Sequence, residues 1–168
     1  MSRTFVMEAV MLAVHGQLLL PGCPVTYIIP HTSIQELYEL QVSEEPIMLS
    51  TEDDGYAKQK IGELISFFEE SFNKKKIEKA LSVPWRKSPP FPINEYVTLN
   101  VVFAIDNEAY GESFDPIETE IILTAIKENA AVLTDQLDML DRIIEAGIPV
   151  QAYDVEDFEY AVEGDYQV

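Results

Sequence analysis

Short apolar segments alternate with helical segments along most of this chain, and this alternation constrains the fold more than any other feature of the sequence. The expected strands are residues 4–7, 25–29, 96–105, 131–133 and 148–153. The expected helices are residues 8–20, 32–41, 56–81, 116–129 and 136–146. The strands are apolar on both faces, which is typical of a parallel sheet covered on both sides. The pattern therefore predicts an α/β fold, a three-layer α/β/α sandwich with a central, mostly parallel sheet.

Turn-forming residues mark several ends of these elements. Residues 21–24 read Pro-Gly-Cys-Pro and end the first helix, because proline cannot continue it. Residues 82–94 hold four prolines and are predicted to form a loop. Gly147 lies where a glycine commonly ends a helix. Within the long central helix, Phe68 and Phe72 belong to an apolar stripe that we expect in the core.

The length of 168 residues fits one domain, so residues 1–168 are expected to form a single unit. Its middle part, residues 43–95, is interpreted as an inserted or variable helix–loop region. Residues 154–168 contain six carboxylates and no basic side chain. This composition predicts a solvated acidic tail at the C-terminus.

The net charge of −19 at pH 7 restricts the partners of this chain. Such a field repels nucleic acid unless it is offset locally, and it favours cations and basic proteins. The single cysteine, Cys23, excludes an internal disulfide and fits a reducing cytoplasm. The apolar run at residues 10–20 is too short to span a bilayer and lacks the basic flank of a signal peptide. We therefore expect a soluble cytoplasmic protein without a membrane partner; whether it forms a homo-oligomer stays open.

Four carboxylates fall near the expected carboxyl ends of the strands, where open parallel sheets bind their ligands. They are Glu8, Glu36, Glu118 and Asp135. Carboxylates brought together at one edge repel one another and attract cations. Oxygen ligands suit Mg²⁺ or Mn²⁺, and such ions activate water for phosphodiester hydrolysis. Thr134 precedes the last of these acids, and its hydroxyl is a candidate for orienting water or a phosphate oxygen.

Each acid also fits a structural role that needs no metal. Glu36 and Glu118 lie three residues after Ser33 and Asp115, the spacing of a helix capping box. Asp135 is a good N-cap for the following helix. The acid after the first strand suits the positive end of a helix dipole. Only the joint placement of the four acids favours a metal site.

Five segments form a pattern that extends from residue 4 to about residue 158. They are Thr-Phe-Val-Met-Glu-Ala-Val at 4–10, Tyr-Ile-Ile-Pro at 27–30 followed by Glu36-Leu37, Glu-Thr-Glu-Ile-Ile-Leu-Thr-Ala at 118–125, Ala-Val-Leu-Thr-Asp at 131–135, and a closing segment at 140–150 that ends Ala-Gly-Ile-Pro-Val. Together they resemble the PIN-domain nucleases, in which acids at these places lie on a strand, a helix, a second helix and the strand after it.

The resemblance implies a PIN-like nuclease that uses Mg²⁺ or Mn²⁺ to hydrolyse RNA, with the same four acids as metal ligands and catalytic residues. Two of them, Glu8 and Glu118, are glutamates where the family usually has aspartate. The longer side chain moves the carboxylate by about one C–C bond, and Mg²⁺ demands near-ideal octahedral geometry. Asp115 and Glu120 are alternatives to Glu118 as the third acid.

A basic segment interrupts the acidic chain, since eight of its eleven basic residues lie between positions 58 and 87. Its candidate nucleic-acid-binding residues are Lys74, Lys75, Lys76, Trp85, Arg86 and Lys87. Lysines and arginines contact phosphates, and a tryptophan can stack on a base. The alternative is a solvated helix end whose lysines complement the helix dipole.

Two hypotheses of different classes therefore stand. The first is a metal-dependent ribonuclease. The second is a catalytically silent PIN-like scaffold that binds a basic protein partner. A receiver-like or hydrolase-like α/β domain is a third. His15, His31 and Cys23 lack the neighbours of a metal or nucleophile motif and are interpreted as ordinary polar residues.

Overall fold

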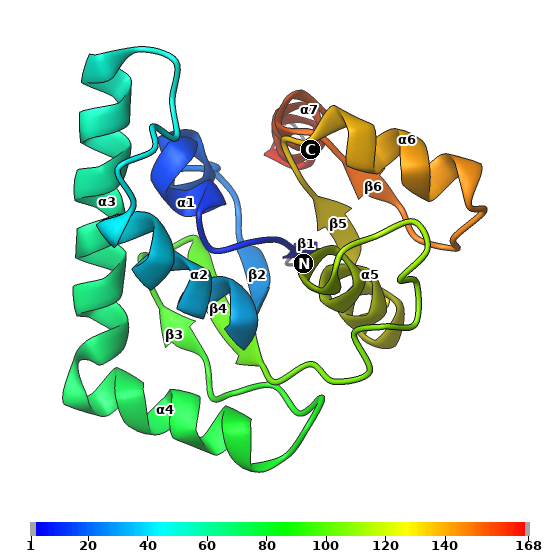
Figure 1. Ribbon diagram of the computed structural model, residues 1–168, viewed down its shortest axis with the longest axis horizontal. Coiled ribbons are helices and arrows are strands. Elements are labelled where there is room, and N and C mark those ends of the chain that lie inside the picture. Colours follow the sequence, from blue (N-terminus) through cyan, green and yellow to red (C-terminus); the bar gives the residue numbers. More distant parts are fainter. Residues whose placement is uncertain (1–2, 167–168) are drawn as a thin grey trace.

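The computed structural model describes residues 3–166 and contains one six-stranded sheet (Figure 1). Its strands are β1 (Arg3–Val6), β2 (Val25–Pro30), β3 (Phe91–Pro92), β4 (Val97–Val102), β5 (Ala131–Leu133) and β6 (Ala152–Tyr153). Their order is β3-β4-β2-β1-β5-β6, and every neighbouring pair is parallel except β3 and β4. The predicted α/β sandwich with a mostly parallel sheet is confirmed.

Helices cover both faces of this sheet. They are α1 (Met11–Val14), the 3-10 helix η1 (Gly16–Leu19), α2 (His31–Val42), α3 (Thr51–Glu69), α4 (Ser71–Ser82), α5 (Pro116–Glu128), α6 (Leu137–Glu145) and α7 (Val155–Tyr166). Side chains of α5 and α6 pack on one face, and those of α1, α2, α3, α4 and α7 pack on the other. The apolar strands are thus buried between two helical layers, as their composition requires.

Alternate strand residues feed two separate hydrophobic cores. Phe5, Tyr27 and Leu133 belong to the core beneath α1–α4 and α7. Their neighbours Val6 and Ile28 belong to the core beneath α5 and α6. This alternation follows from the two-residue period of side chains along a strand.

The first predicted helix, residues 8–20, is wrong as one element. The backbone leaves the helical region at His15 (φ −120°, ψ 83°), which separates α1 from η1. The buried Tyr27 hydroxyl donates to the carbonyl oxygen of Leu18 at 2.6 Å, so this polar contact binds the second half of the segment to the sheet. The break turns the side chain of His15 toward the sheet edge described below.

The predicted helix at residues 56–81 is likewise two helices. The chain turns at Glu70 (ψ 137°), and the Asn73 side chain donates to the carbonyl oxygen of Phe67 at 2.8 Å, which satisfies the end of α3. Phe68 is buried as predicted. Phe72 lies beyond the turn and is 73% exposed, so its assignment to the core is wrong.

The prediction that residues 154–168 form a solvated tail is wrong for the part of this segment that the structure describes, which ends at residue 166. This part forms α7, whose Phe158 is only 1% exposed and contacts the Phe5 ring edge-on at a centroid distance of 5.0 Å. Val162, one turn later, is also buried. Glu156, Asp157, Glu159 and Glu163 are exposed on the outer side of this amphipathic helix, and residues 167–168 lie outside the described part of the chain.

Smaller differences concern strand lengths. Only Ala152–Tyr153 of the predicted strand 148–153 pairs with the sheet, and the predicted loop at 82–94 contains β3. Gly147 has φ +65°, a left-handed conformation that favours glycine, as the sequence predicts.

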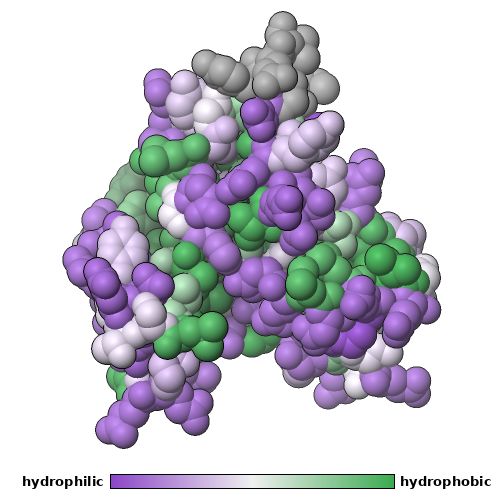
Figure 2. Space-filling view, turned by 90° about the horizontal axis from the view of Figure 1, so that it is seen from above, coloured by the Kyte–Doolittle hydropathy of each residue, from purple (hydrophilic) through white to green (hydrophobic). Residues whose placement is uncertain are grey.

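Hydrophilic side chains cover most of the face in Figure 2, and hydrophobic ones form separate patches between them. No helix within residues 3–166 combines the length and the apolar character needed to cross a bilayer.

Candidate active site

Glu8 lies two residues beyond β1, at the carboxyl edge of the parallel sheet. The preceding amide of Met7 donates to the Ile28 carbonyl oxygen at 3.2 Å, so the ladder with β2 fixes the chain up to this point. Glu8 is half-buried. Burial is the largest cause that raises its pKa, to about 7, and four neighbouring carboxylates raise it further. In decreasing order of effect these neighbours are Glu36, Asp115, Asp135 and Glu118.

The acids around Glu8 come from distant parts of the chain. Glu36 is in α2, which begins directly after β2, and Asp135 follows β5. Asp115 and Glu118 begin α5. Burial also raises the pKa of Glu36, and Glu39 and Asp115 add to the effect. The predicted acids therefore share one edge of the sheet and repel one another there.

Glu118 differs from the other acids because it is already neutralised. Both of its oxygens accept hydrogen bonds from Arg142 in α6, at 3.0 Å and 2.6 Å. The side chain is only 5% exposed, and the guanidinium holds the pKa of this carboxyl below its usual range. A bidentate pair of this kind leaves few lone pairs of the carboxylate for a metal.

Arg142 is itself fixed by several contacts. It donates to the Ser113 carbonyl oxygen at 2.6 Å and to Asp138 at 3.0 Å. Its guanidinium carbon lies 5.0 Å from the centroid of the Phe114 ring. Arg142 is not among the predicted site residues, since an arginine among helical acids carries no motif.

The predicted capping box of α5 is confirmed. The Asp115 side chain accepts from the backbone amide of Glu118 at 2.7 Å, and the Glu118 side chain accepts from the amide of Asp115 at 3.0 Å. Glu118 thus serves the helix start and Arg142 at the same time.

The predicted box at α2 is wrong, because Ser33 donates to the Pro30 carbonyl oxygen and accepts from the Ala9 amide. The Ser33 hydroxyl lies inside the fold and is satisfied by these two backbone groups. Glu36 therefore has no capping role with Ser33 and remains at the acidic edge.

Asp135 is not the N-cap of α6, in contrast to the prediction. Its Oδ2 lies 2.9 Å from His15 Nε2, and Gln136 is the N-cap, without a side-chain bond. The Thr134 hydroxyl is buried and accepts from the Gln136 amide at 3.1 Å. The loop after β5 uses Thr134 for its own backbone, and Asp135 is left pointing to the acidic edge and His15.

Glu120 is a further acid at the start of α5. It is 1% exposed, its Oε1 accepts from Thr32 at 3.0 Å, and its Oε2 has no partner within residues 3–166. Burial raises its pKa, although the Thr32 hydroxyl and the nearby Asn107 side chain oppose this effect. A buried, half-satisfied carboxyl of this kind is costly and favours the protonated form.

The donor chemistry at this edge fits a hard divalent cation, but the side chains are not arranged as a finished cage. Among residues 3–166, no group of three or more His, Cys, Asp or Glu side chains is placed to hold a metal ion. Glu8, Glu36 and Asp135 are the predicted ligands that are not neutralised by an arginine. To hold an ion, the side chains of these three would have to move together, and Glu118 would in addition have to leave Arg142.

Part of the basic segment reaches the same edge of the sheet. Lys87 pairs with Val102 at the end of β4, and the Trp85 amide donates to the Phe103 carbonyl oxygen at 2.9 Å. Lys127 Nζ lies 4.7 Å from the centroid of the Trp85 ring, which covers one face of this aromatic side chain.

The predicted nucleic-acid-binding cations divide into two groups. Lys76 donates to the Pro90 carbonyl oxygen at 2.6 Å, and Lys87 pairs with Glu128 at 3.5 Å. Lys74, Lys75 and Arg86 are exposed, and none of them forms an ion pair with another of residues 3–166. The second group is the part of the basic segment that stays available to a phosphate.

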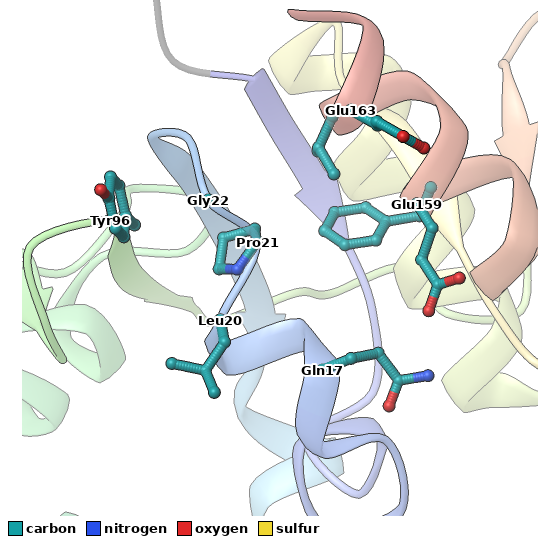
Figure 3. Close-up of a pocket in the computed structure, with 9 residues that line it drawn as sticks. Gln17, Leu20, Pro21, Gly22, Tyr96, Glu159 and Glu163 are labelled. Atoms are coloured by element: carbon teal, nitrogen blue, oxygen red, sulfur yellow. The ribbon is translucent and has the colours of Figure 1, made fainter. Parts of the chain in front are cut away.

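A cavity of about 370 Å³ lies at the opposite edge, where β2 and β4 begin (Figure 3). Leu20, Pro21 and Gly22 line one side of it, and Glu159 and Glu163 of α7 line the other. This cavity is separate from the acids around Glu8.

Comparison with models of known protein families and with curated protein sequences finds no match for this chain.

Proposed function

We propose that this protein is a PIN-like nuclease that hydrolyses phosphodiester bonds, with RNA as its substrate and Mg²⁺ or Mn²⁺ as its cofactor. One observation carries the proposal: Glu8 is half-buried at the carboxyl edge of the sheet and is surrounded by four other carboxylates. Mutual repulsion at such a place is relieved by a cation. The sequence resemblance assigns Glu8 and three of these neighbours, Glu36, Glu118 and Asp135, to the metal site.

Glu8, Glu36 and Asp135 would hold the ion through carboxylate oxygens. A bound divalent ion supplies a hydroxide at neutral pH and neutralises charge on the phosphate. His15 orients Asp135 through the bond at 2.9 Å. The bidentate contact with Arg142 keeps Glu118 ionised, but the guanidinium offsets its charge, so Glu118 adds little net negative charge to the site.

The exposed cations of the basic segment supply the contact with the RNA backbone that the net charge of −19 would otherwise oppose. Lys74, Lys75 and Arg86 would take this role, because their side chains are exposed. Trp85 and Lys87 lie by the carboxyl end of β4, next to β2 and the acidic edge.

The test compares Asp135→Asn with Asp141→Asn, an exposed acid of α6. With Mn²⁺ and single-stranded RNA, we expect Asp135→Asn to lose cleavage by about a hundredfold or more, since loss of a metal ligand or its close partner is costly. Asp141→Asn should cleave like the wild type. Equal activity of both variants, or no cleavage by the wild-type protein with either ion, would overturn the proposal.

A second candidate function is a catalytically silent scaffold that binds a basic protein. The bidentate contact between Arg142 and Glu118 favours it, because this pair occupies one of the four predicted metal ligands. Tight binding of a basic partner, together with a melting temperature that ignores millimolar Mn²⁺, would support the scaffold against the nuclease.

A further inference from the structure

A second cavity, of about 210 Å³, lies between α2 and α4 beside the end of α3; we call it the α2–α4 pocket. Its apolar floor consists of Ile34, Phe68 and Ile77. The α2 residues that line it lie three and four positions apart and therefore share one side of that helix. In Figure 1, α3 runs beside α2, and α4 continues from the lower end of α3 at an angle to it.

Three polar side chains around this floor lack partners. His31, Gln35 and Lys74 line the α2–α4 pocket, and none has a side-chain hydrogen bond or ion pair with another of residues 3–166. Burial lowers the pKa of His31, so its ring is neutral at pH 7 and offers one donor and one acceptor. The amide of Gln35 also offers both, whereas Lys74 offers only donors.

Carboxylates complete the rim. Glu69 accepts from the Tyr38 hydroxyl at 3.0 Å, which fixes the Tyr38 ring at the mouth of the pocket. Glu78 of α4 also lines the pocket and forms no ion pair with any residue in the described range 3–166. An acceptor of this kind matches a ligand that carries an amino group.

The position of the α2–α4 pocket connects it to the proposed catalytic edge. His31 directly follows Pro30, the last residue of β2, and Gln35 is adjacent to Glu36. Lys74 belongs to the exposed part of the basic segment. The pocket therefore shares α2 with Glu36 of the acidic edge, and one exposed cation of the basic segment lines it.

We propose that the α2–α4 pocket binds one nucleobase that carries an exocyclic amino group, cytosine or adenine. This inference rests on the proposed function and specifies the substrate that the nuclease selects. The ring lies on the apolar floor, Glu78 accepts from the amino group, and His31 and Gln35 bind the remaining polar edge. Lys74 contacts the phosphate of the same nucleotide.

The size and chemistry of the pocket favour this ligand over others. Pockets for drug-sized molecules measure roughly 300–1,000 Å³, so a cavity of about 210 Å³ fits one small ring system. A purely apolar side chain of a protein partner would bury the unpaired groups of His31 and Gln35 without satisfying them, which is unfavourable. Carboxylates accept from the amino group of cytosine in known nucleic-acid contacts.

The experiment titrates the metal-free protein, in the presence of EDTA, with cytidine 5′-monophosphate and uridine 5′-monophosphate, followed by NMR. These two ligands differ at position 4, an amino group against a carbonyl, and at N3, an acceptor in cytosine and an N–H donor in uracil. We expect the cytidine nucleotide to bind about tenfold more tightly, the effect of one hydrogen bond, with shifts at α2 and α4. Ribose 5-phosphate, which has no base, should bind more weakly than either.

Glu78→Gln should remove the preference for the cytidine nucleotide, and Gln35→Ala should weaken the binding of both nucleotides. Glu145→Gln, an exposed acid on α6, should change neither. Equal binding of cytidine, uridine and ribose phosphates, or a cytidine preference that survives in Glu78→Gln, would overturn the inference.

Two further measurements extend the experiment. One asks whether the pocket binds an RNA chain or a free nucleotide, and the other separates base binding from RNA cleavage. An oligocytidine that binds much more tightly than the mononucleotide assigns the pocket to an RNA chain, and equal affinity assigns it to a free nucleotide. Because no metal is present, cytidine binding without any Mn²⁺-dependent cleavage would remove the nuclease proposal and keep the pocket.

Discussion

Glu8 and Glu118 are two glutamates at one edge of the sheet, and their surroundings move their pKa values in opposite directions. Burial and neighbouring carboxylates raise the pKa of Glu8 to about 7. Arg142 and a backbone amide lower the pKa of Glu118 in spite of its burial. At neutral pH, Glu118 is therefore ionised and paired with Arg142, whereas Glu8 exchanges its proton readily.

The Arg142–Glu118 pair predicts a stability effect. Arg142→Ala leaves a nearly buried carboxylate without its cation, and we expect it to lower the free energy of unfolding at pH 7 by about 2–4 kcal/mol. Because the folded-state pKa of Glu118 is depressed, this contribution is present above the unfolded pKa of about 4.3 and is lost as pH falls through the folded value. Urea unfolding at pH 7 and pH 3 measures both parts.

The double variant Arg142→Ala/Glu118→Gln controls for this explanation. It removes the unpaired charge, so it should recover part of the stability that Arg142→Ala loses. An Arg142→Ala protein as stable as the wild type at pH 7 would contradict the structural role of the pair.

For single residues, the sequence predicted which acids lie at the sheet edge but not the side chains that contact them. The capping box of Asp115 and Glu118 has a local signature, an N-cap acid followed three positions later by a glutamate, and it is confirmed. The bond between His15 and Asp135 joins residues 120 positions apart and depends on a break in the first helix. Local patterns carry no information about such a contact, because tertiary packing decides which side chains meet.

At the scale of secondary-structure elements, the spacing of apolar residues over 56–81 predicted that this segment is helical. It did not predict the turn at Glu70. Three-residue and four-residue steps continue across that turn, so periodicity alone cannot locate it. For residues 154–168, the acidic composition led to the opposite error, because a helix was overlooked. Charge suggested a solvated end, whereas the spacing of Phe158 and Val162 by one turn is the signal of the amphipathic helix α7.

Two aromatic residues of α7 should contribute very differently to the stability of the protein. Phe158→Ala removes a ring that is 1% exposed and packed against Phe5, so we expect a loss of about 3–5 kcal/mol of unfolding free energy. Tyr160→Ala, on the outer side with 82% exposure, should change stability by less than about 0.5 kcal/mol. Chemical denaturation of both variants provides the test, and equal effects would show that α7 does not pack on the core in solution.

For the whole molecule, the acidic edge and the net charge of −19 act in the same direction. Both make the protein unfavourably charged, and the divalent cation proposed to bind at Glu8 would offset part of this repulsion. The parallel topology is the reason, since it carries Glu8, Glu36 and Asp135 to one edge from separate strands and helices. Strand-end reasoning from the sequence anticipated this gathering, but it could not anticipate the neutralisation of Glu118.

Glu8→Gln tests this balance between stability and metal binding. A carboxyl whose folded pKa is raised from 4.5 to about 7 binds more protons folded than unfolded, so stability falls as pH rises through that interval. Without metal, Glu8→Gln should therefore be more stable than the wild type at pH 8, by about 1–3 kcal/mol, and no more stable at pH 4.

With Mn²⁺ at pH 8, the wild type should become more stable than Glu8→Gln. The ion binds only the folded state and needs a deprotonated Glu8, so it should raise the melting temperature of the wild type more at pH 8 than at pH 6. Glu8→Gln should lose most of this rise, while Glu145→Gln on the outer surface of α6 should keep it. A wild-type melting temperature that is independent of Mn²⁺ at pH 8 would remove the metal site. A stabilised Glu8→Gln protein would then still confirm that the acids at this edge repel one another.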